Sequence, residues 1–226
     1  MITLYAGPLS LFSRKISIAL DEKGLSFAEE LVPFTQERGY QPTHPAVLAN
    51  SPKRQVPVLI DDDLILFDST VILEYLEEAY PAVPLYPNGA KARARCRLLE
   101  LTADEILFAP VRDLLYRTEP PYADPAIQAR REEVALQSEG RIRQQFGALG
   151  QRLGDQAFFC GDLSAADIGL FMTTFWVQRL AGPGLGDFPR LSAWYQRLLA
   201  RPAFAKAAAQ IAAADRELSP ALKSRS

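Results

Sequence analysis

Two serines three residues apart lie near the amino terminus, where their hydroxyls could take part in chemistry. Ser10 and Ser13 form the ends of the stretch SLFS, which follows a short apolar run and precedes a helical pattern. A hydroxyl at the start of a helix can accept a hydrogen bond from a backbone N–H and so cap the helix. It can also donate a hydrogen bond to an anion held at the positive end of the helix dipole. The stretch therefore predicts a cap, an activating group, or both.

The residues present give little support to several other kinds of chemistry. The chain has one histidine, His44, and two cysteines, Cys96 and Cys160, which cannot form a zinc site from spaced ligand pairs. No serine lies in a G-x-S-x-G elbow, and His44 would be the only base available to a serine hydrolase. Rossmann and P-loop fingerprints are absent from the sequence. We expect no bound metal.

The composition is that of an ordinary globular chain. It has 226 residues, of which 48% are hydrophobic, and 25 basic against 27 acidic residues give a formal charge of -2. No global positive field would attract nucleic acid or anionic lipid, so neither is expected as a partner. The amino terminus has no pattern of an export signal, and no apolar run approaches the ~20 residues of a membrane span. We expect a cytoplasmic protein with two free thiols, Cys160 packing in the core.

Around these serines, the first eighty residues alternate short apolar runs with helical patterns. Their order, β-α-β followed by β-β-α, predicts a small mixed sheet with helices packed on it. Asp61–Asp63 has the composition of a hairpin turn between two of the strands. The predicted strands are Ile2–Tyr5, Phe27–Val32, Val56–Ile60 and Leu64–Phe67, and the predicted helices are Phe12–Lys23 and Ser69–Ala79.

After residue 80 the strand patterns stop. Residues 80–89 hold three prolines and a glycine, which end the preceding helix and indicate a linker. Ser164 and Asp167 have the spacing of a capping box, with Asp in place of Glu, in which the Asp side chain returns to the Ser164 N–H. The segment from Asp215 onward is polar and is expected to fray. The predicted helical stretches are 90–117, 125–153, 164–180, 189–200 and one that begins after Pro202.

Three motifs and this capping box together make the chain resemble the cytosolic glutathione transferases, in particular bacterial serine-type members of the theta or zeta kind. The motifs are SLFSRKISIAL, NSPKRQVPVL and FDSTVILEYLEEAYP, and the box is GDLSAADI. The resemblance covers nearly the whole chain. It implies a thioredoxin-like α/β domain at 1–80 that binds glutathione, a linker at 81–89 and an all-α domain at 90–226. It also implies a homodimer.

The resemblance further implies where glutathione binds. The Val56-Pro57 peptide bond should be cis, which leaves the Val56 backbone groups free to pair with the cysteinyl part of glutathione. Ser69 should bind the γ-glutamyl carboxylate at a helix N-terminus, and Asp68 should assist with the ammonium. Gln55 also matches a substrate-contacting position. The other candidates for contact with glutathione are Lys53, Arg54, His44 and Asp104, each of which could equally be an ordinary surface residue.

Three hydroxyls compete for activation of the glutathione thiol. Ser10 falls where serine-type members carry the activating serine, Ser13 where redox members carry the second thiol of C-x-x-C, and Tyr5 where other classes carry a tyrosine. Making a thiol with a pKa of roughly 8.5 anionic at pH 7 takes about 3 kcal/mol. A charged hydrogen bond supplies about 1.5 to 3 kcal/mol and the helix end about 0.3 to 1 more. One serine is therefore nearly sufficient, and we favour Ser10.

The function that the resemblance implies is conjugation of glutathione, as a co-substrate, to a hydrophobic electrophile, with detoxification as the role. Since neither cysteine lies at position 10, a mixed disulfide with glutathione cannot form there. The alternatives are a glutathione-dependent dehalogenase, peroxidase or isomerase, or a non-catalytic regulatory protein of the stringent-starvation type that binds a protein partner. The residues that could line an acceptor pocket, or else pack in the core, are Phe12, Phe108, Tyr116 and Trp176.

Overall fold

A computed structural model describes residues 1–41, 43–219 and 221–222, and in it the chain forms two compact units. The first unit comprises residues 1–86 and 201–218. The second comprises 87–200 and the described residues that follow Leu218. The chain therefore leaves the first unit, builds the second, and returns to the first with its last long helix. The sequence-based division into 1–80, 81–89 and 90–226 stays a prediction.

The first unit is built on a four-stranded mixed sheet with the order β2-β1-β3-β4. Strand β1 (Ile2–Ala6) pairs in parallel with β2 (Phe27–Leu31) and antiparallel with β3 (Val58–Asp61), which forms a hairpin with β4 (Leu64–Phe67). The predicted mixed sheet is confirmed. Strand β1 lies inside the sheet, and Leu4 and Ala6 on it are fully buried.

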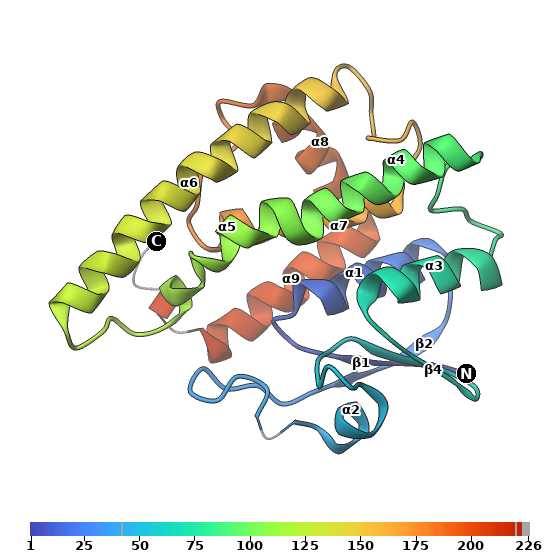
Figure 1. The fold of residues 1–226 in the computed structure, drawn as a ribbon. Helices are drawn as coiled ribbons and strands as arrows, with labels where there is room; N and C mark the ends of the chain where they lie inside the picture. Colours follow the sequence, from blue (N-terminus) through green and yellow to red (C-terminus); the bar gives the residue numbers. More distant parts are fainter. Residues whose placement is uncertain (42, 220, 223–226) are drawn as a thin grey trace. The chain divides into compact units, whose positions relative to one another are not determined.

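Helices cover both faces of this sheet. Figure 1 shows α1 (Leu11–Glu22) and α3 (Ser69–Ala79) on one face and the short α2 (Pro45–Asn50) on the other. Helix α1 buries Ile16, Ala19 and Leu20, and Lys23 ends it with a backbone hydrogen bond to the Ala19 carbonyl.

The last helix, α9 (Pro202–Leu218), packs on α1 within the first unit. Two ion pairs fix it there: Arg201 to Glu22 at 2.6 Å and Lys206 to Asp21 at 2.8 Å. The expectation that the chain frays from Asp215 onward is wrong for residues 215–218, because they continue α9.

The second unit is helical. It contains α4 (Ala90–Leu101), α5 (Phe108–Arg112), α6 (Pro125–Leu153), α7 (Ala165–Arg179) and α8 (Pro189–Leu199). The single stretch predicted at 90–117 is broken by a π-helical turn at Thr102–Leu107 and ends in a 3-10 turn at Leu115–Thr118. Pro110 lies just after the π turn, and its missing N–H removes one α-helical hydrogen bond there. No helix in the described ranges is long and apolar enough to cross a bilayer.

The Asp167 side chain connects several segments of the second unit by hydrogen bonds. The predicted capping box is present, since the Asp167 carboxylate accepts the Ser164 N–H at 3.0 Å and the Ser164 hydroxyl at 2.7 Å. It also accepts the Phe159 N–H at 3.0 Å and the Trp194 indole N–H at 2.9 Å. Burial raises the pKa of Asp167, and these hydrogen bonds oppose the rise. The carboxylate thus connects the start of α7 to α8 and to the preceding loop.

Asp167→Asn should destabilise the second unit by about 3 kcal/mol, because an amide cannot accept from all of these donors and a buried donor left unpaired is costly. Both tryptophans, Trp176 and Trp194, lie in this unit, so urea unfolding followed by tryptophan fluorescence reports on it. Asp162→Asn changes an exposed carboxylate five residues away and should leave the midpoint unchanged. Equal midpoints for Asp167→Asn and wild type would contradict this account.

Candidate functional site

Strand register brings three chain segments to one end of the sheet in the first unit. Tyr5 near the end of β1 pairs with Val58 at the start of β3, and Val58 pairs with Phe67 at the end of β4. The segments that continue from these residues are therefore neighbours: the loop to Ser10, the dipeptide Val56-Pro57, and the pair Asp68-Ser69. Helices α1 and α3 both begin here, so two positive helix ends lie at this edge.

The Val56-Pro57 peptide bond is cis, as the resemblance implied. Pro57 is buried, whereas Val56 is half-buried and precedes the first residue of β3. Since β3 begins only at Val58, the Val56 backbone stands just outside the ladder that β3 forms with β1.

Ser10 is the N-cap of α1. Its Oγ accepts the backbone N–H of Ser13 at 3.2 Å, and its own N–H donates to the Gly7 carbonyl at 3.1 Å. The cap uses a lone pair of the hydroxyl and leaves its proton unused. Within the described ranges that proton is donated to no protein group, and the side chain is half-buried. Ser10 can therefore cap the helix and donate to a bound anion at the same time.

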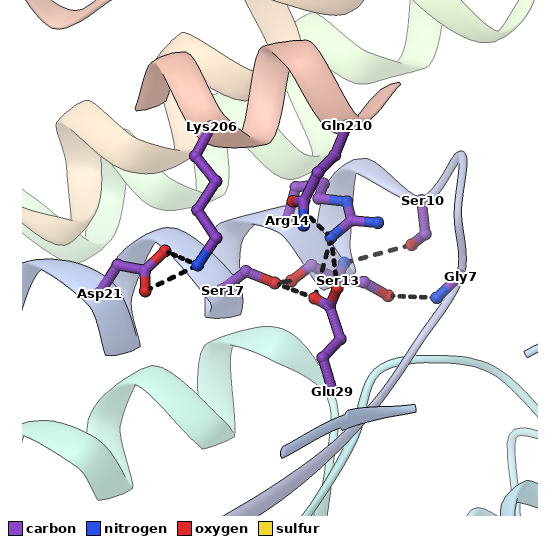
Figure 2. A network of polar contacts seen from close by, with 9 residues as sticks. All are labelled: Gly7, Ser10, Ser13, Arg14, Ser17, Asp21, Glu29, Lys206 and Gln210. Carbon is purple, nitrogen blue, oxygen red and sulfur yellow. Dashed lines mark hydrogen bonds and ion pairs between the residues drawn. The ribbon is translucent and has the colours of Figure 1, made fainter. Parts of the chain in front are cut away.

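Ser13 is in a different position from Ser10, although it belongs to the same stretch. Its side chain is fully buried, and its Oγ accepts the Gly7 N–H at 3.1 Å (Figure 2). Gly7 approaches the Tyr40 side chain so closely that a Cβ added at Gly7 would be 2.2 Å from the Tyr40 hydroxyl oxygen. Ser13 thus holds the loop between β1 and α1 in place from the inside.

Tyr5 is half-buried and packs against a small core cluster of the first unit. Its ring lies against the cluster of Val32, Val47 and Val58, and 5.6 Å separates its ring centroid from that of His44. His44 caps α2, with Nδ1 accepting the Ala46 N–H at 3.3 Å. Both rings therefore have a structural role, Tyr5 in packing and His44 in capping α2.

The Asp68-Ser69 pair begins α3. Asp68 Oδ1 accepts the Thr70 N–H at 3.1 Å, and Oδ2 pairs with the Lys53 ammonium at 2.5 Å. Burial raises the pKa of Asp68, but the hydrogen bonds from Lys53 and Thr70 outweigh it, and the net pKa lies below the ordinary value. Asp68 has a φ of 75°, and Ser69 is 5% exposed. The loop residues Gln55 and Arg54 are exposed.

The candidates further along the chain lie in the second unit. Asp104 is on the π-helical turn, and Phe108 starts α5. Tyr116 is buried and hydrogen-bonds to Glu132, while the Trp176 ring is buried beneath the Arg179 guanidinium at 4.4 Å. Phe12 is half-buried in the first unit, with the Lys15 ammonium 5.7 Å from its ring. An acceptor pocket formed by these aromatic residues stays a prediction.

A buried polar network beneath Ser10 was not predicted from the sequence. Arg14, which is 1% exposed, donates to Glu29 Oε1 at 2.8 Å and to Gln210 Oε1 at 2.9 Å (Figure 2). Ser17 donates to the same Glu29 oxygen at 2.8 Å. The network joins α1, β2 and α9 and so fixes the helix that presents Ser10. The adjacent charges Arg14 and Lys15 would usually indicate a solvated helix face, which hid the network from sequence reasoning.

The chain matches family models along most of its length. Residues 4–84 match the N-terminal domain and residues 106–202 the C-terminal domain of glutathione S-transferase. In the part of the chain that the structure describes, no cluster of three or more His, Cys, Asp or Glu side chains could hold a metal ion.

Individual relatives carry different names. A stringent starvation protein A homolog of Coxiella burnetii is 40% identical over 101 residues, which is 44% of this chain and 44% of that protein, so the match spans less than half its length. Maleylacetoacetate isomerase of Pseudomonas aeruginosa is 31% identical over 211 residues, which is 90% of this chain and 94% of that protein. A crystal structure of a Methylobacterium radiotolerans glutathione S-transferase in complex with glutathione sulfonate has a TM-score of 0.71 at 26% identity and covers 92% of this chain and 94% of that one.

The mixed sheet, the cis proline and the helical second unit thus define a glutathione-transferase fold. With both domain models matched, the chain belongs to the glutathione S-transferase family.

Ser13→Ala should loosen the loop between β1 and α1, because the buried Gly7 N–H loses its acceptor at a cost of about 1 to 3 kcal/mol. Hydrogen exchange at the Gly7 amide should become faster, whereas Ser26→Ala, at an exposed position in the same unit, should leave it unchanged. Unaltered exchange in Ser13→Ala would show that the hydrogen bond does not hold the loop.

Proposed function

We propose that this protein is a glutathione transferase in which the Ser10 hydroxyl stabilises the thiolate of bound glutathione. One observation carries the proposal: Ser10 caps α1 with a lone pair and keeps its proton available. This hydroxyl stands at the sheet edge where the cis Val56-Pro57 bond and the Asp68-Ser69 pair also lie.

The chain's own groups suggest how glutathione would be held. The Val56 backbone would pair with the cysteinyl part, and Ser69 with the α3 amides would accept the γ-glutamyl carboxylate. Asp68 is charged at neutral pH and could take the ammonium, with Gln55 beside it and Asp104 as a further candidate. Lys53 or Arg54 would meet the glycyl carboxylate, and His44 is the remaining candidate contact. Lys53 forms an ion pair with Asp68. If the two side chains contacted different groups of glutathione, this ion pair would open when the ligand binds.

Activation then needs no histidine. The Ser10 proton would be donated to the thiolate, at about 1.5 to 3 kcal/mol, and the N-terminus of α1 would add about 0.3 to 1 kcal/mol. These contributions approach the ~3 kcal/mol that ionises a thiol near neutral pH. Tyr5 and Ser13 remain the alternatives to Ser10, but packing of the Tyr5 ring and burial of Ser13 support them less.

The thiolate would attack a hydrophobic electrophile, with Phe12, Phe108, Tyr116 and Trp176 as candidate pocket residues. Isomerisation is a related possibility, which the similarity to a maleylacetoacetate isomerase over nearly the whole chain supports. The cytoplasmic location, the detoxification role and the homodimer belong to the same proposal.

A second candidate is a regulatory protein that binds a protein partner and has no catalytic activity. It is favoured by the similarity of about half the chain to stringent starvation protein A homologs. Affinity for immobilised glutathione separates the two: an enzyme of the proposed kind is retained and eluted by free glutathione, whereas a regulator of this type is not retained.

A series of variants at Ser10 separates capping from activation. Ser10→Asp keeps a capping acceptor and removes the donated proton, so stability should hold while conjugation to a chlorodinitrobenzene falls about 100-fold. Ser10→Thr keeps both roles and should retain most activity, and Ser10→Ala should lose activity with little loss of glutathione affinity. The thiolate absorbance of bound glutathione should titrate at higher pH in Ser10→Asp and Ser10→Ala than in wild type.

Ser26→Ala is the control for this series, since Ser26 is an exposed serine of the same unit. Wild-type activity in Ser10→Ala would transfer the role to Tyr5 or Ser13. Absence of turnover with a broad panel of electrophiles, together with no retention on glutathione, would overturn the enzyme proposal altogether.

Ser10→Cys should gain thiol–disulfide exchange with glutathione, because a thiol at a helix N-terminus has a lowered pKa and can form a mixed disulfide. Reduction of a small disulfide by glutathione should be faster in this variant than in wild type. If Ser10→Cys shows no exchange, position 10 does not face the bound thiol.

A further inference from the structure

A cavity in the second unit combines a thiol with two cations that lack a partner. It has a volume of about 370 Å³, and its lining includes Cys160, Arg95, Arg152 and Gln156. Within the described ranges neither arginine forms a hydrogen bond or an ion pair with the protein. Two guanidinium groups that converge without a carboxylate favour an anionic ligand, especially one with carboxylates.

Cys160 can be reached from this cavity. The sequence placed it in the core, but its side chain is half-buried and lines the cavity wall just before the capping box of α7. Cys96 on α4 lies beside it and is fully buried. The pair therefore consists of one accessible and one shielded thiol.

The surroundings make the two thiols unequal. Hydrogen bonding from Cys96, followed by that from Ser164 and the charge of Arg152, lowers the pKa of Cys160 against the effects of burial and Asp167. Interaction with Cys160 and burial raise the pKa of Cys96. A thiolate that is partly exposed in a positive environment is the kind that attacks disulfides.

We propose that Cys160 is a site of S-thiolation by an anionic low-molecular-weight disulfide of the glutathione disulfide kind, and that Cys96 is the resolving thiol. The Cys160 thiolate attacks one sulfur of the disulfide, forms a mixed disulfide with that half and releases the other half as a thiolate. Cys96 then attacks the Cys160 sulfur, and its proton passes to the departing thiolate. The balance is one Cys96–Cys160 disulfide formed and one small disulfide reduced to one thiolate and one thiol.

Arg95 and Arg152 would bind the carboxylates of the incoming disulfide and raise its local concentration at Cys160. Gln156, at the same cavity wall, offers an amide that can serve either a carboxylate or a peptide group. The site involves neither Ser10 nor glutathione bound to the first unit. Failure of this proposal would therefore not contradict the proposed transferase activity, and failure of that activity would not contradict this proposal.

Intact-mass measurement after exposure to glutathione disulfide, with peptide mapping, tests the assignment. Wild type should lose two hydrogens and yield a Cys96–Cys160 peptide pair. Cys96→Ser should instead gain one glutathionyl group on Cys160, and Cys160→Ser should gain none. A glutathionyl group that persists on wild type would overturn the role of Cys96, and modification of Cys96 in Cys160→Ser at the wild-type rate would overturn the role of Cys160.

The arginines are tested by rate. In a Cys96→Ser background, Arg95→Gln with Arg152→Gln should slow thiolation by glutathione disulfide about tenfold and should leave the rate with the uncharged bis(2-hydroxyethyl) disulfide within twofold. Arg190→Gln removes a cation of the same unit that pairs with Asp155, outside the cavity, and should change neither rate. Equal slowing with both disulfides, or none with either, would overturn the anionic specificity.

Discussion

The pairing of β1 on both of its edges is the constraint on which the candidate site depends. A central strand that is parallel to β2 and antiparallel to β3 fixes, at its carboxyl end, the positions of the segments that follow β2 and precede β3. The pairing of β3 with β4 brings the start of α3 to the same end. The loop to Ser10, the cis Val56-Pro57 bond and the start of α3 come from distant parts of the sequence. They lie close together because the pairing of the strands fixes their register.

At that edge Ser10 offers different atoms for helix capping and for the proposed contact with a ligand. A serine oxygen has lone pairs that satisfy the first turn of α1 and a proton that remains for a ligand. The buried hydroxyl of Ser13 and the buried guanidinium of Arg14 hold the surrounding loop and helix. The placement of the Ser10 hydroxyl therefore depends on these buried polar contacts.

The sequence was informative wherever a residue type has a local physical consequence. Asp167 at the third residue after Ser164 predicts a capping box because the geometry spans one turn, and the short apolar run Ile2–Tyr5 predicts a strand within the same few residues. Arg14 could not be predicted in the same way. Its partner Gln210 lies almost two hundred residues further on, and nothing in the local pattern shows which charged positions a distant helix will cover. The π-helical turn before Pro110 was not predicted for a related reason: one extra residue in a helical turn barely changes the helical periodicity of the sequence.

The return of α9 to the first unit has a consequence for how this protein is made. The chain that leaves the first unit at Tyr86 comes back to it only at Arg201, so α1 lacks the helix that covers Arg14 until residues 202–218 have been synthesised. An amino-terminal fragment that ends at the linker would expose a buried guanidinium and the apolar surface that surrounds it. In this architecture the sheet-containing unit therefore begins before the helical unit, and it is completed only after residues 87–200 have been made.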